Sequence, residues 1–323
     1  MINVTRLGCP DILKINSTPQ SNGEWETRDA IEYYRNSTNH QKKYKRTGVK
    51  GARIDQGYAI YSDKNVRKLL IQMFHGKCAY CESKITAIYN GDIEHFRPKG
   101  EIKEVNPTKP GYFWLASEWE NLLFACPFCN QTNTHEYKNG DYVEEAVLGK
   151  LDQFPLDAEV HRLNHTHGII YFADNTTYDR AFRLEESVRL LLNPCKDDNI
   201  EKYFKFNDDG AIISNDGLTD FEERKAQKSI ITYALHRLPL TIAREEKIIQ
   251  IKAQIRRVEN AIINYNDNLN TTDEKRIWFE GIMREEMTIL KKFKDSDQEY
   301  AGLARYIIDK YFNDADFMIV PSV

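Results

Sequence analysis

The 323-residue sequence has 45 lysines and arginines against 49 aspartates and glutamates, for a formal net charge of −4. This balance excludes a protein that binds polyanions over its whole surface, so any basic surface must be local. No run of about 18 apolar residues and no signal-peptide pattern occurs, so we expect a cytoplasmic protein without a membrane span, long enough for one large domain or several small ones.

The first 64 residues are polar and basic. Residues 35–68 hold ten basic and two acidic side chains, a local charge of +8. Glycines at 48 and 51 would let the backbone approach phosphates. Such a run indicates either a solvated surface or an arm that contacts nucleic acid. The basic residues at the centre of this run are Lys42, Lys43, Lys45 and Arg46.

The next stretch, residues 65–140, begins with a predicted amphipathic helix. Val66, Leu69, Leu70 and Met73 are spaced by three and four residues, which is typical of a helix over residues 65–74. Residues 92–97 are short and half apolar, as in a strand. Residues 118–125 are compatible with a helix or a buried turn.

The rest of the chain divides into a mixed region, residues 141–219, and a helical region, residues 220–323. FKFNDDGAIIS predicts a hairpin, because turn residues separate two alternating runs. Three helices are expected after about residue 220. Thr271 with Glu274, and Ser296 with Glu299, predict capping boxes for the second and third.

Four of the six cysteines form two CxxC pairs, Cys78 with Cys81 and Cys126 with Cys129. In a chain without a secretory signal this spacing indicates metal ligation more than disulfides, and hence a reducing compartment. Four thiolates complete the tetrahedral coordination of Zn²⁺ and leave no open position. We therefore expect a structural zinc site whose binding energy contributes to folding.

Three polar residues lie close to these pairs in sequence. His95 follows the first pair, Asn121 precedes the second by five residues, and Asn130 comes directly after Cys129. Each residue alone is ordinary, but closure of a zinc site would bring all three together. Arg97 and Lys99 follow His95 and are candidates for phosphate contact.

The segments IEHFRP, ENLLFAC and CPFCN resemble the HNH endonuclease family, which has a ββα-metal module. The resemblance implies that His95 is the general base and that Asn121 fixes the loop that carries it. It further implies that Asn130 and Glu94 bind a catalytic Mg²⁺ or Mn²⁺, with Asp92 as the alternative to Glu94. An all-oxygen site of this kind prefers hard ions over zinc.

Further segments, including FPL, LLLNPCKDDN and LHRLPLTIAR, resemble the HNH nuclease subunit of Septu-type anti-phage systems and related retron effectors. The resemblance covers about residues 65–245 and implies an ABC-type ATPase partner. We expect an α+β fold, with a zinc-stapled ββα nuclease core and a largely helical C-terminal region, that hydrolyses DNA. The alternatives are a ribonuclease acting on structured RNA such as tRNA, and a zinc-knuckle scaffold without catalysis.

Overall fold

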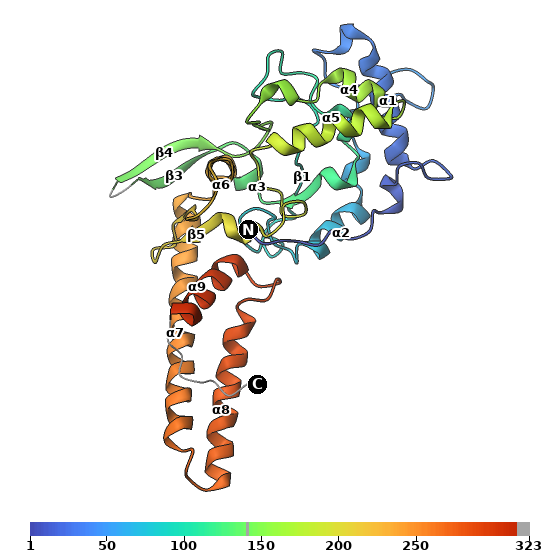
Figure 1. Ribbon diagram of the computed structural model, residues 1–323. Coiled ribbons are helices and arrows are strands. Elements are labelled where there is room, and N and C mark those ends of the chain that lie inside the picture. The colour runs from blue at the N-terminus through green and yellow to red at the C-terminus, as the bar shows by residue number, and fades with distance from the viewer. Residues whose placement is uncertain (140–141, 315–323) are drawn as a thin grey trace.

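Short antiparallel sheets and helices alternate along the residues that the computed structural model describes, 1–139 and 142–314, so the fold is α+β. The helices are α1 (Asn22–Arg35), α2 (Lys64–Met73), α3 (Pro127–Asn130), α4 (His165–Ile170), α5 (Asn175–Val188), α6 (Asp220–Thr232), α7 (Leu238–Asp267), α8 (Asp273–Lys292) and α9 (Ala301–Asp314). The strands are β1 (Asp92–His95), β2 (Leu122–Ala125), β3 (Asn133–Asn139), β4 (Tyr142–Leu148), β5 (Phe204–Phe206) and β6 (Ile212–Ser214). Two hairpins project from the main body, one made of β3 and β4 and one of α7 and α8 (Figure 1).

A β1–β2–α3 unit lies at the centre of the main body. The two strands pair antiparallel, with Asp92 opposite Ala125 and His95 opposite Leu122. All four residues of β2 are buried, which is why a segment without alternating polarity forms a strand here. Cys126 then caps α3, and Pro127 occupies the first helical turn, where its missing N–H is not needed.

The N-terminal region is more ordered than its polar sequence suggests. The hydroxyl of Ser21 accepts a hydrogen bond from the Glu24 backbone and starts α1. The Glu26 carboxylate is fully buried and accepts hydrogen bonds from the backbone of Ala59 and from the hydroxyl of Ser117. These partners are distant in sequence, so the local pattern could not show how the tertiary structure holds this helix.

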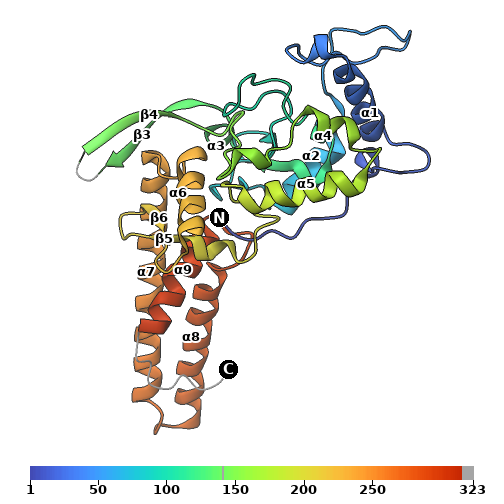
Figure 2. The same cartoon turned by 45° about the horizontal axis from the view of Figure 1, so that its top comes forward.

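The β3–β4 hairpin interrupts the path from α3 to the rest of the chain. Most side chains of β4 are exposed, whereas β3 packs against the start of α7, where Tyr137 pairs with Arg237 (Figure 2). It ends at Gly149, whose backbone packs so closely on residue 131 that an added Cβ would lie 1.9 Å from the Gln131 carbonyl oxygen. Because of this close approach, the chain that follows the hairpin lies next to the end of α3.

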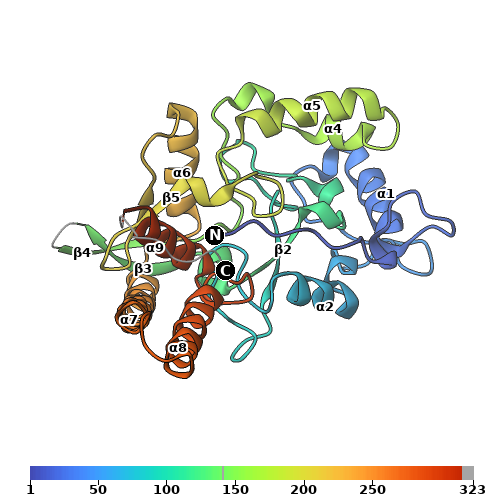
Figure 3. The ribbon, with the colours of Figure 1, turned by 60° about the horizontal axis from the view of Figure 1, so that its bottom comes forward.

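The C-terminal helices form their own smaller cluster of buried side chains. α7 and α8 run side by side as a long hairpin, and α9 packs against α7 (Figure 3). Six buried residues form the cluster: Ile251, Ile255, Val258, Leu290, Ala304 and Ile308. Among the described residues, no helix is both long enough and apolar enough to cross a membrane.

The sequence predicted some of these elements and missed others. The helix over residues 65–74 and the hairpin at residues 204–214 are confirmed as α2 and as β5–β6. Both predicted capping boxes are wrong. The N-cap of α8 is Thr272, without a side-chain cap. Ser296 accepts a hydrogen bond from Arg305 and Glu299 accepts one from Lys84, so tertiary contacts take the side chains assigned to the second box.

The main hydrophobic core draws residues from every part of the chain. It includes Leu13 and Tyr44 near the N-terminus, Phe124 in β2, Tyr203 before β5, and Leu303 in α9. The proposed boundaries at residues 64, 140 and 219 remain predictions, because this core includes residues from each of the regions that they separate.

Candidate metal centre and candidate active site

The four cysteines of the two CxxC pairs gather at one point. Their sulfur atoms all lie within 4.8 Å of one another, and all four side chains are buried. The sulfurs of Cys81 and Cys126 are 3.8 Å apart. Soft donors in this number and at this separation fit a tetrahedral zinc ion, so the chain holds a cluster that could bind structural zinc.

Backbone contacts hold the two cysteine pairs in place. The Ala79 N–H donates to the Phe124 carbonyl at 2.7 Å and ties the first pair to β2. The Asn130 N–H donates to the Cys126 carbonyl at 3.0 Å and closes the turn of the second pair. The cluster thereby fixes Asn130 close to the end of the β1–β2 sheet.

His95 ends β1 and is buried, with 5% of its surface exposed. Its ring Nε2 lies 2.9 Å from the Ala116 carbonyl oxygen, which can only accept, so Nε2 carries the proton. Nδ1 is left as the acceptor, 3.2 Å from the ammonium of Lys99. Burial and the Lys99 charge lower the pKa of His95 well below its usual value, so the ring is neutral at physiological pH.

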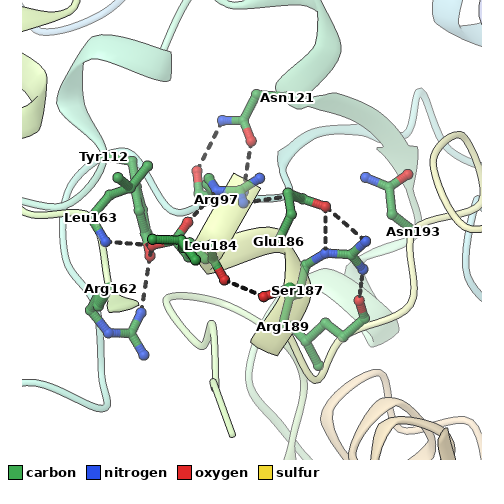
Figure 4. Close-up of polar contacts among 12 residues, drawn as sticks. Arg97, Tyr112, Asn121, Arg162, Leu163, Leu184, Glu186, Ser187, Arg189 and Asn193 are labelled. Atoms are coloured by element: carbon green, nitrogen blue, oxygen red, sulfur yellow. Dashed lines mark hydrogen bonds and ion pairs between the residues drawn. The ribbon is translucent and has the colours of Figure 1, made fainter. Parts of the chain in front are cut away.

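Asn121 connects three backbone groups around the His95 loop. Its Oδ1 accepts from the Arg97 N–H at 2.7 Å, and its Nδ2 donates to the carbonyls of Arg97 and Leu115, both at 3.0 Å. Two of these bonds, with the backbone of Arg97, are drawn in Figure 4. A buried carboxamide with all three bonds satisfied holds the loop after β1 in one conformation.

The carboxylates of β1 have different partners. Asp92 accepts hydrogen bonds from the side-chain amides of Asn130 and Gln131, both at 2.9 Å. Glu94 instead forms an ion pair with Lys150, at 2.6 Å. Of the two candidate ligands, Asp92 is thus the one in contact with Asn130, and the oxygen atoms of these two residues suit a hard divalent ion.

Lys150 was not singled out in the sequence, yet it is fully buried beside the candidate site. Its ammonium also donates to the His95 carbonyl at 2.9 Å, so it bridges consecutive residues of β1. Burial raises the pKa of Glu94, and the charge of Lys150 opposes this rise. No sequence motif marks Lys150, because it comes from the turn after the β3–β4 hairpin.

Asp92, Glu94, His95, Lys99 and Asn130 line one cavity of about 370 Å³. The structure thus places the candidate general base, the candidate ligands and one candidate phosphate contact around a shared space. Asn121 lies behind this wall and supports it. Among the described residues, the four cysteines are the only set of three or more His, Cys, Asp or Glu side chains close enough to hold a metal ion.

Arg97 points away from the cavity side of this loop. Its guanidinium is 2% exposed and forms ion pairs with Glu185 at 2.8 Å and with Glu186 at 2.5 Å. Glu186 also pairs with Arg189, as Figure 4 shows. Since two carboxylates engage its charge, Arg97 is not among the proposed phosphate contacts.

The basic segment of the N-terminal region is anchored by α1. The hydroxyls of Tyr34 and Tyr33 donate to the carbonyls of Lys42 and Lys43, both at 3.0 Å. Tyr44 is buried and bonds to Asp29, whereas the side chains of Lys42, Lys43 and Lys45 are exposed and that of Arg46 is half-buried. The chain then continues to Tyr61, whose ring packs edge-on against that of His95, with the two ring centroids 4.5 Å apart. The exposed lysines therefore precede a segment that lines the cavity.

No protein-family model matches this chain. It is 37% identical over 202 residues to the Septu protein PtuB of Bacillus mycoides (strain KBAB4), covering 60% of this chain and 55% of PtuB. It is also 26% identical over 152 residues to the Septu protein PtuA of the same strain, covering 46% of this chain and 16% of PtuA. The chain thus spans about half of PtuB and a small part of PtuA. The chain is thus similar to two Septu proteins over part of its length.

Proposed function

We propose that this protein is a metal-dependent endonuclease of the HNH type that hydrolyses phosphodiester bonds of DNA. The observation that carries the proposal is the shared cavity in which the Nε2-protonated His95 lies with Asp92 and Asn130 beside a four-cysteine cluster. A neutral imidazole, oxygen ligands for a hard ion and nearby cations are the groups that phosphodiester hydrolysis needs.

His95 acts as the general base. Its Nδ1 removes a proton from the attacking water. Its Nε2 keeps its own proton, which stays hydrogen-bonded to the Ala116 carbonyl oxygen. Asn121 holds the loop so that the ring does not turn as its charge changes. The neighbouring charge of Lys99 disfavours the imidazolium that forms and so promotes release of the proton.

Asp92 and Asn130 are the residues that would hold Mg²⁺ or Mn²⁺, and Glu94 supports β1 through its pair with Lys150. A hard divalent ion bound there would polarise the phosphate and neutralise charge on the leaving oxygen. Lys99 and the exposed lysines of the N-terminal arm contribute positive charge toward the phosphate backbone of the substrate.

The biological role follows from the similarity to the two Septu proteins. We propose that the chain is the nuclease effector of an anti-phage system and acts with a PtuA-type subunit, expected to be an ABC-type ATPase. The near-neutral net charge of −4 favours such a partner, because a nuclease without a broadly basic surface captures DNA weakly at physiological salt.

The test is cleavage by the purified chain, alone and with a PtuA-type subunit, on plasmid DNA and on total cellular RNA. We expect plasmid cleavage that requires the divalent ion and that His95→Ala abolishes, with zinc content and folding unchanged. The matched control is His165→Ala, an exposed histidine of α4.

Each of the other outcomes assigns a different function. Loss of RNA alone would make the protein a ribonuclease. If His95→Ala retained every activity, including phage resistance in cells, the cavity would not be catalytic. The chain would then serve as a zinc-dependent scaffold.

A further inference from the structure

Two arginines at the start of α7 are buried without a carboxylate partner. Arg237 is 5% exposed and Arg244 is 3% exposed. Among the ion pairs of the described residues, neither forms one, although eleven other arginines do. A buried guanidinium without a counter-charge is strongly destabilising, so an anion is expected close by.

Arg237 contacts the cysteine cluster. The Arg237 Nη1 donates to the sulfur of Cys129 at 3.4 Å and to the Ala234 carbonyl at 2.9 Å. Arg244 lies about two turns further along α7 and donates to the Leu235 carbonyl at 2.6 Å; burial lowers the pKa of its guanidinium and the charge of Cys81 opposes this. Four thiolates around one divalent cation form a net dianion, which two guanidinium groups would neutralise.

The first cysteine pair is held by the other end of the helical region. Residues 298–302, which lead into α9, bond to residues 77–84 through four contacts. The shortest is the bond from the Lys84 N–H to the Glu299 carboxylate, at 2.6 Å. The Ser83 hydroxyl lies 3.3 Å from the sulfur of Cys81 and 3.1 Å from the hydroxyl of Tyr300. The residues that flank the first cysteine pair therefore contact the segment around the start of α9, and Cys129 of the second pair contacts Arg237 at the start of α7.

We propose that Arg237 and Arg244 are the counter-charges of the four-cysteine metal centre, and that metal occupancy controls the docking of α7, α8 and α9 on the β1–β2–α3 unit. When the metal is bound, the anionic centre attracts the start of α7. When it is removed, the buried thiolates take up protons, the two guanidinium groups lose their counter-charge and the helices dock less firmly. The metal thus links the C-terminal helices to the β1–β2–α3 unit and also holds the two cysteine pairs together. This inference does not depend on the nuclease proposal.

The test uses the full chain and three variants, Arg237→Met, Arg244→Met and Arg256→Met. Arg256 is exposed on the same helix and serves as the matched control. We measure the rate of zinc transfer to a coloured chelator and the deuterium uptake of α7, α8 and α9, with zinc bound and after its removal. Arg237→Met and Arg244→Met are expected to release zinc about tenfold faster or more, whereas Arg256→Met matches the natural sequence.

The comparison of loaded and stripped protein separates the proposal from a packing role. A counter-charge variant raises deuterium uptake in the loaded protein but not in the stripped one, where the buried cation was already uncompensated. Poorer packing alone raises uptake equally in both states, and that result would overturn the proposal, as would unchanged zinc release. If Arg237→Met does not fold, Arg237→Lys keeps the charge but loses the directed N–H, and it is expected to give intermediate zinc release. Release equal to that of Arg256→Met would again overturn the proposal.

Discussion

The imidazole of His95 and the carbonyl of Ala116 are joined by a contact of 2.9 Å that fixes which ring nitrogen bears the proton. Because Nε2 donates to the carbonyl, Nδ1 carries the lone pair that can accept a proton, and this lone pair faces the Lys99 ammonium at 3.2 Å. The arrangement depends on Asn121, whose carboxamide bonds to Leu115 and holds the backbone just before Ala116. The backbone of Leu115 and Ala116 therefore contacts both the base, His95, and its supporting residue, Asn121.

The first prediction concerns pH. Burial lowers the pKa of His95 well below its ordinary value of 6.5, and the charge of Lys99 lowers it further. The neutral base therefore persists to lower pH than an exposed histidine would allow, and cleavage at saturating metal should stay constant as the pH falls from about 8 to 6. Lys99→Met should raise this pKa and move the acidic decline of the pH–rate profile to higher pH. An unmoved decline would mean that the titrating base is another group.

The second prediction concerns Asn121. Asn121→Ala leaves the Arg97 N–H and the Arg97 carbonyl without partners in a buried site, which we expect to cost about 1–3 kcal/mol of the free energy of unfolding for each group left unsatisfied. The Leu115 carbonyl keeps its bond from the Glu118 N–H at 3.3 Å. Urea denaturation measures this loss, and Asn260→Ala on the exposed face of α7 is the control. Cleavage should fall even at temperatures where the variant is fully folded. A folded variant with full activity would show that the loop does not need this support.

How far the site could be predicted is clear from the residues involved. The cysteine cluster follows from spacing alone, because two CxxC turns present four thiolates whatever lies between them, and that prediction is confirmed. The sequence alone could not show whether Asp92 or Glu94 contacts Asn130. The answer depends on Lys150, 56 residues further along than Glu94, which engages the Glu94 carboxylate.

The same reason explains what was missed in the fold. The partners of Arg97 are Glu185 and Glu186 in α5, nearly 90 positions away, and no local pattern connects them. In contrast, α2 and the β5–β6 hairpin follow from periodicity and turn residues, which act over a few positions. Local elements were accessible from sequence, whereas buried charge pairing required tertiary structure.

The third prediction separates the two candidate metal ligands. Asp92→Asn should raise the concentration of Mg²⁺ or Mn²⁺ needed for half-maximal cleavage by about tenfold or more, since it removes the carboxylate in contact with Asn130. Glu94→Gln should leave this concentration unchanged, because its carboxylate serves Lys150. Metal titrations of both variants decide the matter. The reverse pattern would make Glu94 the ligand.

The fourth prediction concerns the basic arm. Replacing three of its exposed lysines by alanine should weaken binding to DNA of any sequence and reduce the salt dependence of binding, by about 0.9 in the logarithmic slope for each phosphate that is no longer neutralised. The variant carries Lys42→Ala, Lys43→Ala and Lys45→Ala, and a control of equal charge change carries Lys275→Ala, Lys291→Ala and Lys292→Ala on α8. If the two triple variants lost the same DNA affinity, the loss would be a general charge effect, and the arm would not bind DNA.

The fifth prediction tests whether Lys150 and Glu94 act as a unit. Lys150→Met leaves the buried Glu94 carboxylate and the His95 carbonyl without their shared partner, so we expect a loss of about 3–5 kcal/mol in the free energy of unfolding. Glu94→Gln leaves the buried ammonium without its counter-ion and should also destabilise. The double variant should be less destabilised than the sum of the two, because neither buried charge then remains. The coupling energy from denaturation of all four proteins measures the pair, and a value near zero would show that solvent already compensates one of the charges.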